Sequence, residues 1–265
     1  MRNFFEVMEC IKISAVIITL NEEKNIQKCI DSVKDVVDEV LVVDSFSSDD
    51  TKKIAISLGA RVVEHAFEGH IQQKTWAVSQ SEFPYVLSLD ADEALSTELK
   101  KSVLEARNNW NSDGYFFTRI NYYCGKWIKH GGWYPDRKLR LWDKRKGKWG
   151  GVNPHDQFEM DAGSVTKHLK GDLLHFSYNR ISQHILQNDN FSTIGAHERF
   201  DLGKKPSFFK LIFSPAFSFI KNYILKLGFL DGFYGLVIAV NVAHYTFLKY
   251  AKLIELHKIK NDEIN

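Results

Sequence analysis

The amino-terminal part of the chain alternates short apolar runs, rich in β-branched side chains, with segments in which apolar positions recur at helical spacing. Uninterrupted apolar runs are typical of strands buried on both faces, and their alternation with helices predicts a parallel sheet between helical layers. The predicted strands cover residues 13–19, 39–43, 61–64 and 85–89, and the predicted helices cover residues 23–33, 50–58, 71–79 and 96–108. The expected fold class is therefore α/β, with a mostly parallel central sheet.

Polar residues follow three of these predicted strands. Thr19, Asn21 and Glu22 follow the first strand, and Asp44 and Ser45 follow the second. In an open parallel sheet the carboxyl ends of the strands meet at one edge, where ligands bind, so we expect these side chains to converge there. Two interpretations of Asp44 stay open. Asp and Ser are ordinary turn formers, but a carboxylate here could also accept hydrogen bonds from a base or a ribose.

The third polar segment, Asp90-Ala91-Asp92-Glu93, places three carboxylates directly after the apolar run 85–89. Carboxylates this close repel one another and resist burial, and a hard divalent cation such as Mg²⁺ or Mn²⁺ between them would offset that repulsion. The alternative is that Asp90 or Asp92 caps the helix predicted at 96–108. Because capping needs one carboxylate and the segment holds three, the pattern favours a metal site.

After Gly114 the sequence becomes rich in aromatic residues, which we interpret as a wall on the acceptor side of the site. Residues 137–142 alternate like a strand, which predicts that Arg137 and Lys138 face opposite sides while Leu139 and Leu141 share one side. Such a strand could aim basic side chains at a diphosphate. A solvated, charged edge strand is the more frequent explanation of this composition, and both interpretations stay open.

From residue 183 onward the sequence predicts a helical appendage that associates with a membrane or forms a dimer. Phenylalanine and isoleucine form a broad face between 208 and 220, and Pro215 is expected to kink or split this helix. A second apolar stretch, 233–248, is one-sided and shorter than the ~20 residues of a spanning helix, which favours an interfacial helix. The alternative is a helical pair that packs on the catalytic domain or on a second subunit. The polar face of the first helix is expected to contain Lys210, Ser214, Ser218 and Lys221.

Composition narrows the class of protein. With 265 residues, 44% of them hydrophobic, the chain can bury a full core, and its net charge of +2 gives no reason to expect nucleic acid as a partner. Three widely spaced cysteines without a Cys-x-x-Cys pair give no zinc signal and fit a reducing compartment. The first apolar run is too short for a secretory signal or a membrane span, so we expect a cytoplasmic location.

Neither Gly-x-Gly-x-x-Gly nor a P-loop motif is present, which disfavours a dinucleotide-binding fold and a P-loop enzyme.

Four segments, in this order and spacing, resemble glycosyltransferase family 2, whose members bind nucleotide sugars on the GT-A fold and carry an Asp-x-Asp metal motif. Within that family the chain is most similar to the lipopolysaccharide core glucosyltransferases, through residues 44–49, 140–142 and 147–156. This closer resemblance extends to the region of Ser182. The four segments that carry the family resemblance are residues 14–23, 42–51, 73–77 and 86–93.

The resemblance implies a UDP-sugar site at the strand ends. Thr19 and Glu22 would line the nucleoside pocket, and Asp44 would bind the uracil or the ribose. Lys74 would approach the base or the diphosphate; without the resemblance, a solvated helix lysine would be the simpler explanation. The other residues expected to bind the donor are Asn21, Ser45, Asp90, Ala91, Arg137 and Arg140.

The resemblance also implies a metal ion and a separate base. Asp92 would ligate Mg²⁺ or Mn²⁺, with Asp90 touching the ribose or the metal shell. Inverting transfer needs a base for the acceptor hydroxyl and a cation for the departing diphosphate. Asp156 is the expected base, at a position where the resemblance leads us to expect Glu, and Glu159 is the reserve candidate. His155 would bind the metal or the diphosphate, or is a turn histidine after a proline.

The sequence therefore predicts an inverting, metal-dependent glycosyltransferase that moves a hexose, with glucose as first choice, from a UDP donor to a cell-envelope glycan such as the lipopolysaccharide core. A lipid-linked acceptor and a peripheral position on the inner face of the cytoplasmic membrane would suit the carboxyl-terminal helices, and a homo-oligomer is compatible with them. The competing hypotheses are a sugar-phosphate nucleotidyltransferase and a non-catalytic nucleotide-sugar scaffold. The expected domains are a catalytic domain over 1–182, divided near 113, and the appendage over 183–265.

Overall fold

The structure is a computed structural model that describes residues 10–152 and 155–262. The chain forms two compact units. The first contains the residues up to Arg119 together with Asp136–Phe176, and the second contains Ile120–Pro135 together with the residues from Ser177 onward. The segment Ile120–Pro135, which the sequence placed in the acceptor half, therefore folds with the carboxyl-terminal helices.

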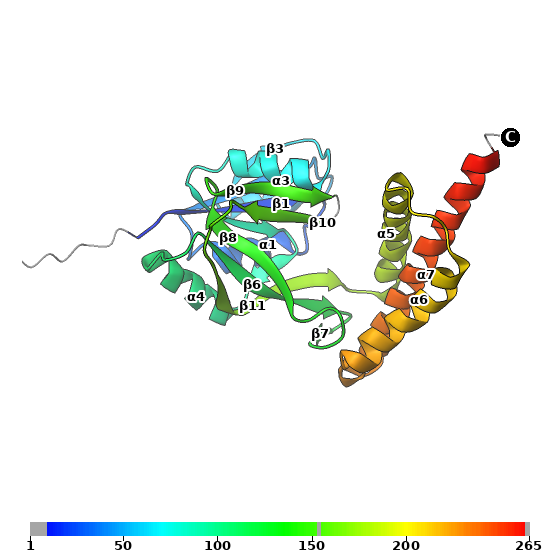
Figure 1. Ribbon diagram of the computed structural model, residues 1–265. Helices are drawn as coiled ribbons and strands as arrows, with labels where there is room; N and C mark the ends of the chain where they lie inside the picture. The colour runs from blue at the N-terminus through cyan, green and yellow to red at the C-terminus, as the bar shows by residue number, and fades with distance from the viewer. Residues whose placement is uncertain (1–9, 153–154, 263–265) are drawn as a thin grey trace, which may run out of the picture. The chain divides into compact units, whose positions relative to one another are not determined.

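The main sheet has nine strands, in the order β3-β2-β1-β4-β8-β6-β11-β5, with β7 paired to β6 (Figure 1). The strands β3, β2, β1 and β4 pair in parallel, whereas β8 pairs antiparallel with β4 and β6. The α/β class is confirmed, and the sheet is mixed because parallel pairing among β3, β2, β1 and β4 is followed by antiparallel pairing of β8 with β4 and β6. The strands are β1 Ile13–Thr19, β2 Glu39–Asp44, β3 Arg61–Glu64, β4 Tyr85–Asp90, β5 Glu93–Leu95, β6 Gly114–Tyr123, β7 Lys126–Ile128, β8 Asp136–Asp143 and β11 Thr166–Tyr178.

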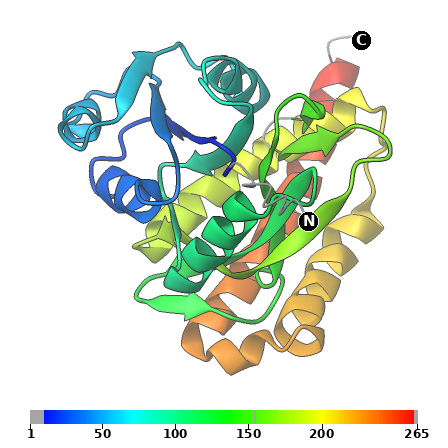
Figure 2. The same cartoon turned by 90° about the vertical axis from the view of Figure 1, so that its left-hand side faces the viewer.

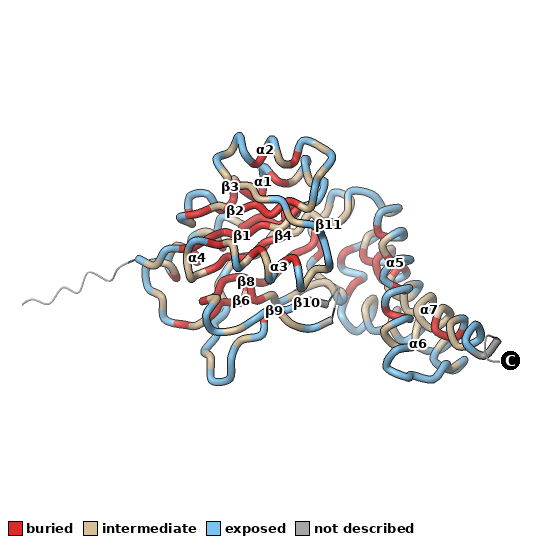
Figure 3. Tube along the Cα trace, turned by 90° about the horizontal axis from the view of Figure 1, so that it is seen from above, coloured by how far each residue is buried: buried red, intermediate tan, exposed pale blue. Residues whose placement is uncertain are grey.

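Apolar side chains cover both faces of the parallel strands, which Figure 3 shows as buried positions along β1, β2 and β4. On β1, Ile13, Ala15 and Ile17 pack with α1 and α4, whereas Val16 belongs to a second cluster with α3. This division follows from the alternation of side chains along a strand. The helices of this unit are α1 Ile26–Val33, α2 Thr51–Ser57, α3 His70–Ser79 and α4 Thr97–Asn108.

The four predicted strands and four predicted helices are all present, with ends that differ by at most a few residues. The suggestion that Asp90 or Asp92 caps the following helix is wrong. Ser96 is the N-cap of α4, and its hydroxyl accepts a hydrogen bond from the backbone N–H of Leu99 at 3.2 Å. The short strand β5 separates the two aspartates from that helix, so they are left for another role.

Strand β8 contains a bulge that the alternation of its sequence does not reveal. Tyr115 of β6 lies opposite Leu141 and Phe116 lies opposite Leu139, so Arg140 is an extra residue on β8. The prediction that Leu139 and Leu141 share a side is wrong, because the extra residue shifts the alternation: Leu141 packs in the first cluster and Leu139 in the second. Bulges of this type redirect a side chain, and here the residue concerned is Arg140.

A separate antiparallel hairpin, β9 Gly147–Val152 and β10 His155–Met160, packs on the second cluster. Phe158 stacks on Trp142 of β8, with ring centroids 4.2 Å apart, and Trp149 meets the same ring edge-on at 5.5 Å. In the described part of the chain the hairpin is not hydrogen-bonded into the nine-stranded sheet. Aromatic contacts therefore hold it in place.

The second unit is largely helical. Its core is an aromatic cluster around Tyr123, whose ring packs edge-on against Trp133, Tyr178 and His184. Helices α6 and α7 lie side by side (Figure 2). Helix α6 continues through Pro215, so the prediction that this proline splits the helix is wrong. The elements are α5 Ile181–Asp201, α6 Phe208–Ile220, the π-helical turn η1 Lys221–Leu225, the 3₁₀ turn η2 Gly228–Asp231 and α7 Phe233–Asp262.

Within residues 10–152 and 155–262, the structure contains no helix with the length and apolarity required to cross a membrane.

Candidate active site

The ends of β1, β2 and β4 lie next to one another, as predicted. In the parallel register Thr19 pairs with Asp44, and Ile18 pairs with Asp90. The loops after β1 and β2 are joined through Asn21, whose side-chain Oδ1 accepts a hydrogen bond from the Ser48 backbone N–H at 2.8 Å. Asn21 has a φ of 55°, a left-handed conformation that Asn adopts more readily than most residues. The sequence therefore builds a fixed polar rim at this edge of the sheet.

Asp44 is completely buried and serves as the anchor of the loop that follows it. Its carboxylate accepts hydrogen bonds from the backbone N–H of Ser47 at 2.7 Å and from the Ser47 hydroxyl at 2.6 Å. The turn-forming interpretation of Asp44 is thus correct for the free protein. The Ser45 hydroxyl accepts a hydrogen bond at 3.0 Å from the amide of Gln73, which ties this loop to α3.

Two residues after β1 have polar atoms suited to a ligand. The Thr19 hydroxyl is buried without a hydrogen-bond partner among the described residues, which is unusual for a native polar atom. Burial raises the pKa of Glu22, an effect partly offset by the hydrogen bond that its carboxylate accepts from Asn25 at 2.7 Å. Both side chains lie at the end of β1, where the sequence predicted the donor nucleoside.

Lys74 joins two of the predicted site residues. Its ammonium lies 3.1 Å from Asp90 Oδ1 and 2.8 Å from Asp156 Oδ2, and only 4% of the lysine side chain is exposed. It also lies over the ring of Trp149, 5.1 Å from the centroid, where a cation is favoured. The structure therefore brings together residues from α3, β4 and β10, and the solvated-helix explanation of Lys74 is wrong.

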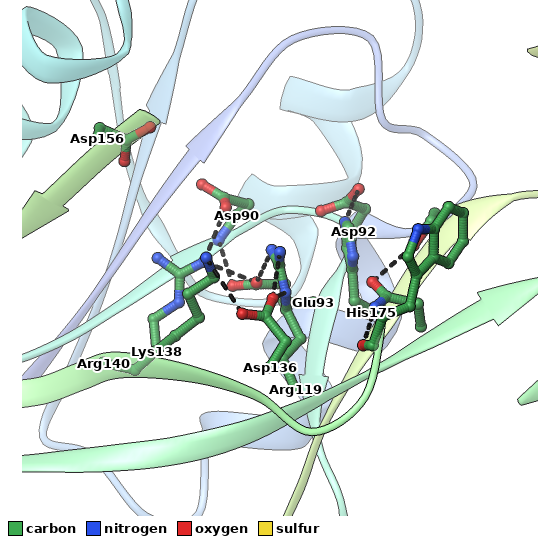
Figure 4. A network of polar contacts seen from close by, with 12 residues as sticks. Asp90, Asp92, Glu93, Arg119, Asp136, Lys138, Arg140, Asp156 and His175 are labelled. Carbon is green, nitrogen blue, oxygen red and sulfur yellow. Dashed lines mark hydrogen bonds and ion pairs between the residues drawn. The ribbon is translucent and has the colours of Figure 1, made fainter. Parts of the chain in front are cut away.

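Burial alone would raise the pKa of Asp90, but Lys74 and Arg140 more than offset that effect and hold the pKa well below its ordinary value. The Arg140 guanidinium lies 3.0 Å from Asp90 Oδ2 and 2.7 Å from Glu93 Oε1 (Figure 4). Although burial opposes the charge of Arg140, these carboxylates raise its pKa above the ordinary value. The bulge in β8 thus directs Arg140 to the carboxylates at the end of β4.

Glu93 is a structural member of the acidic segment. It is completely buried, lies 3.3 Å from the Arg119 guanidinium, and accepts a hydrogen bond from the Asp90 backbone N–H at 3.1 Å. The prediction that one metal ion offsets all three carboxylates is therefore wrong for Glu93, because arginines do so. Figure 4 shows Asp90, Glu93 and Asp136 close to the cations Arg119, Lys138 and Arg140. Lys74 adds a further cation, which pairs with Asp90 and Asp156.

Asp92 stands apart from this balanced set. Its Oδ2 lies 3.0 Å from Nε2 of His175 on β11, and both side chains are partly exposed. Within the part of the chain that the structure describes, no three His, Cys, Asp or Glu side chains gather as a complete metal cage. A carboxylate and an imidazole nevertheless fit a divalent cation that takes its remaining oxygen ligands from a diphosphate and water. The side chain of His155, the other predicted ligand, lies outside the described residues.

Two further residues that were predicted to bind the sugar donor are Ala91 and Arg137, and the structure gives them different roles. Ala91 is buried, and its backbone N–H donates to the Ile18 carbonyl at 3.1 Å, so its role is to hold the β4 end in place. Arg137 is exposed and, because neighbouring residues of a strand alternate in direction, it faces the side opposite to Lys138. The structure therefore brings Arg140 to the site but does not bring Arg137.

Sequence reasoning missed His175, Arg119 and Asp136. They come from β11, β6 and β8, strands that a parallel βα pattern does not include. A histidine within the apolar run Leu173-Leu174-His175-Phe176 was a usable signal, because an imidazole in such a run needs a polar partner. Glu159, the reserve base, is exposed and lies three residues from Asp156 on β10, so the two side chains point to opposite faces of the hairpin.

Comparison with known proteins agrees with this geometry. The sequence model described as Glycosyl transferase family 2 matches residues 14–164. An uncharacterized glycosyltransferase of Rickettsia typhi is 36% identical over 256 residues, which cover 92% of this chain and 87% of that protein. The lipopolysaccharide core biosynthesis glycosyltransferase LpsC of Rhizobium meliloti is 31% identical over 259 residues, which cover 94% of each chain. These matches confirm the resemblance drawn from the four sequence segments.

A solved structure is also similar in part. Glucosyl-3-phosphoglycerate synthase from Mycobacterium tuberculosis, crystallised with Mn²⁺, UDP and phosphoglyceric acid, is 27% identical over 43% of this chain and 44% of its own, at a TM-score of 0.35. The family match covers more than half of the chain, and the relatives match nearly all of it. The chain therefore belongs to glycosyltransferase family 2 and is a glycosyltransferase with the GT-A fold.

Proposed function

We propose that this glycosyltransferase is inverting and metal-dependent, and that it transfers a hexose, with glucose as first choice, from a UDP-sugar to a cell-envelope glycan such as the lipopolysaccharide core. The acceptor class is supported by the similarity to LpsC over most of both chains. The observation that carries the mechanism is the position of Lys74 between Asp90 and Asp156, beside the pair Asp92 and His175. This arrangement provides cations that can bind a diphosphate. It also provides a carboxylate that can take the proton of an acceptor hydroxyl.

The donor nucleoside would lie on the rim formed by the loops after β1 and β2. The Thr19 hydroxyl and the Glu22 carboxylate would supply polar contacts to the nucleoside. The loop that Asp44 anchors would line the bottom of the site. Lys74 and Arg140 lie within reach of one carboxylate, Asp90, so a diphosphate placed beside it meets two cations. We propose that these residues hold the donor with its anomeric carbon toward Asp156.

Asp92 and His175 would hold Mg²⁺ or Mn²⁺, and His155 remains a predicted further ligand. When bound, such a cation supplies positive charge to the diphosphate leaving group. Asp92 would offer its carboxylate and His175 a neutral imidazole nitrogen, while Arg119, Arg140 and Lys74 neutralise the other acids nearby. The remaining acids are thereby prevented from repelling the donor.

Asp156 is proposed as the base. The acceptor oxygen forms a bond to the anomeric carbon, its proton passes to Asp156, and the bond from the anomeric carbon to the diphosphate oxygen breaks. Attack from the side opposite the leaving group inverts the configuration at that carbon. Since the hydroxyl loses its proton as the new bond forms, an ordinary carboxylate is a sufficient base. The ion pair between Lys74 and Asp156 orients this carboxylate before the acceptor arrives.

The function is tested by measuring melting temperatures against a panel of nucleotide sugars, with Mn²⁺ and with a chelator, followed by turnover with the stabilising donor. A ligand that binds only the folded state raises the melting temperature. We expect stabilisation by UDP-glucose that requires the cation. Stabilisation by a different nucleotide class, or stabilisation that is unchanged by chelator, would contradict the proposed donor or the proposed metal dependence.

Replacing the two metal-site residues separates their role from folding. We expect Asp92→Asn and His175→Ala each to weaken the apparent affinity for Mn²⁺ by about 10-fold or more, with the donor-free melting temperature little changed. His168, a histidine on the same strand that is hydrogen-bonded to Thr118, provides the matched control as His168→Ala. Equal Mn²⁺ dependence in all three variants and the wild type would remove Asp92 and His175 from the metal site.

A further inference from the structure

Helix α6 and the turn η1 are oriented with their apolar side outward. Ser214 and Ser218 are half-buried, and Asn222, also half-buried, donates a hydrogen bond to the Ser218 carbonyl at 2.8 Å. The predicted polar face is thus divided, because the serines turn toward the protein while Lys210 and Lys221 stay exposed. We call the other side of these two elements the outward face. Its residues are Phe208, Phe209, Ile212, Phe213, Phe217, Ile220, Ile224 and Leu225.

The outward face is exposed to an extent that is unusual for large apolar side chains. Phe209 is 68% exposed, Phe217 is 62% exposed and Leu225 is 67% exposed, and neither α6 nor η1 contains a buried residue. Single exposed apolar residues are common, but a contiguous row of them marks an interaction site. Folding in water would favour the reverse orientation, with the serines outward.

Exposed apolar residues continue beyond η1. Phe229 and Leu230 of η2 are 43% and 53% exposed, and Phe233 at the start of α7 is 66% exposed. Along α7, Leu236 and Val240 extend the row at helical spacing, at 39% and 51% exposed. The apolar surface of this unit therefore extends through several consecutive elements.

The segment that carries the outward face contains lysines but no acids. Between residues 202 and 230 the sequence contains five lysines and no aspartate or glutamate, although acids and bases nearly balance over the whole chain. All five lysines are exposed in the structure. An aromatic and aliphatic face bordered by lysines is the pattern of a helix that lies in the interface of an anionic bilayer. The five are Lys204, Lys205, Lys210, Lys221 and Lys226.

We propose that the outward face inserts into the headgroup region of a bilayer that contains anionic lipid, with the five lysines on the lipid phosphates. This inference deepens the proposed transfer to a cell-envelope glycan, but it depends only on residues of the second unit. A second copy of the chain is a poorer occupant. A two-fold interface places the same surface of each copy against the other, so the lysine border of one would meet the lysine border of its partner.

The experiment is flotation of the full-length protein with vesicles of phosphatidylcholine alone and of phosphatidylcholine with phosphatidylglycerol. We expect the wild type to float with the anionic vesicles and to be released by salt. Phe213→Ser combined with Phe217→Ser is expected to raise the lipid concentration needed for half binding by about 10-fold or more. Lys221→Gln combined with Lys226→Gln is expected to raise it about 25-fold on anionic vesicles, because each lysine near such a surface contributes about fivefold.

The matched control is Ile56→Ser on α2, an exposed apolar residue of the first unit that is 56% exposed. It should float like the wild type, and circular dichroism should show that all variants keep their helices. Absence of flotation of the folded wild type, or flotation of the phenylalanine variant at wild-type lipid concentration, would overturn the proposal. A wild-type dimer that the phenylalanine variant dissociates, without a change in flotation, would identify a second copy as the occupant instead.

Turnover distinguishes this inference from the proposed function. With a UDP-sugar and a soluble acceptor fragment, the phenylalanine variant should retain wild-type turnover while it loses flotation. Loss of flotation with intact turnover supports the bilayer contact alone. Intact flotation in a protein that fails to transfer sugar would count against the proposed transfer and leave the bilayer contact standing.

Discussion

The ammonium of Lys74 lies 2.8 Å from the carboxylate of Asp156, and this ion pair links the end of the nucleotide-binding sheet to the hairpin that carries the proposed base. The same ammonium lies 3.1 Å from Asp90, so one buried cation serves two carboxylates. A donor diphosphate is a third anion that competes for this cation. We propose that the diphosphate draws Lys74 toward itself and thereby leaves the Asp156 carboxylate available to an acceptor hydroxyl.

Replacement of Lys74 by methionine should remove both ion pairs while filling a similar volume. Breaking a buried ion pair by removing one partner leaves the other charge uncompensated, so we expect a loss of about 3 kcal/mol in unfolding free energy. Donor binding should weaken in parallel. Urea unfolding and donor titration measure the two effects. Lys52→Met, which removes the largely exposed ion pair with Glu64, is the control and should change stability by less than about 1 kcal/mol.

Asp156→Asn tests the base. Loss of a general base lowers turnover by about 100-fold or more, and we expect kcat to fall while the donor dissociation constant stays within a few fold. Glu159→Gln is the matched change on the opposite face of the same hairpin and should leave kcat unaltered. Normal turnover in the Asp156 variant, or a loss confined to the Glu159 variant, would show that the base has been assigned to the wrong residue.

Arg140 and Arg137 form a natural pair for comparison, because they lie on one strand but only Arg140 reaches the acids. Arg140→Gln leaves Glu93 buried without its nearest cation, and we expect a loss of about 3 kcal/mol or more in unfolding free energy. Arg137→Gln, at an exposed position, should change stability by less than about 0.5 kcal/mol and leave donor affinity unaltered. A large effect of Arg137→Gln on donor affinity would restore the role predicted from the sequence.

His184 gives the second unit a predictable response to pH. Burial lowers the pKa of His184 to about 4 in the folded chain, whereas an unfolded histidine titrates near its ordinary value of 6.5. Between these values the unfolded state binds the extra proton, so stability is full above about pH 6.5 and falls as the pH drops toward 4, by up to about 3 kcal/mol. His184→Gln removes this proton. Unfolding free energies measured at pH 7.5 and 5 should therefore converge in the variant, and an equal pH dependence in both proteins would contradict this account.

The parallel half of the fold and the strand-end loops could be predicted from the sequence, because both follow from local periodicity. Apolar runs define β1, β2 and β4, and the register then requires Thr19, Asp44 and Asp90 to lie at one edge. The polar residues after those strands could be predicted without knowing how the rest of the chain folds. The family resemblance supplied Lys74, whose burial in the site could not be derived from its own helix.

The rest of the site depends on partners that are distant in sequence. The bulge at Arg140 is a mismatch between β6 and β8, and neither strand alone contains it. Glu93 resembles a metal ligand when only its neighbours are considered, yet Arg119 and Arg140 neutralise it from other strands. His175 meets Asp92 across a separation of 83 residues. Local patterns predicted where the chemistry lies, and long-range pairing decided which side chains take part.

The hairpin that carries Asp156 packs on Trp142 of β8 through its own rings, Trp149 and Phe158. Stacked rings can slide past one another at small cost, whereas the directional hydrogen bonds of a sheet ladder resist such displacement. The proposed base therefore lies on a hairpin held by ring contacts, whereas the proposed nucleotide site lies on a hydrogen-bonded sheet. We therefore expect the hairpin to shift for acceptors of different bulk, while the sheet that carries the proposed donor site keeps its conformation.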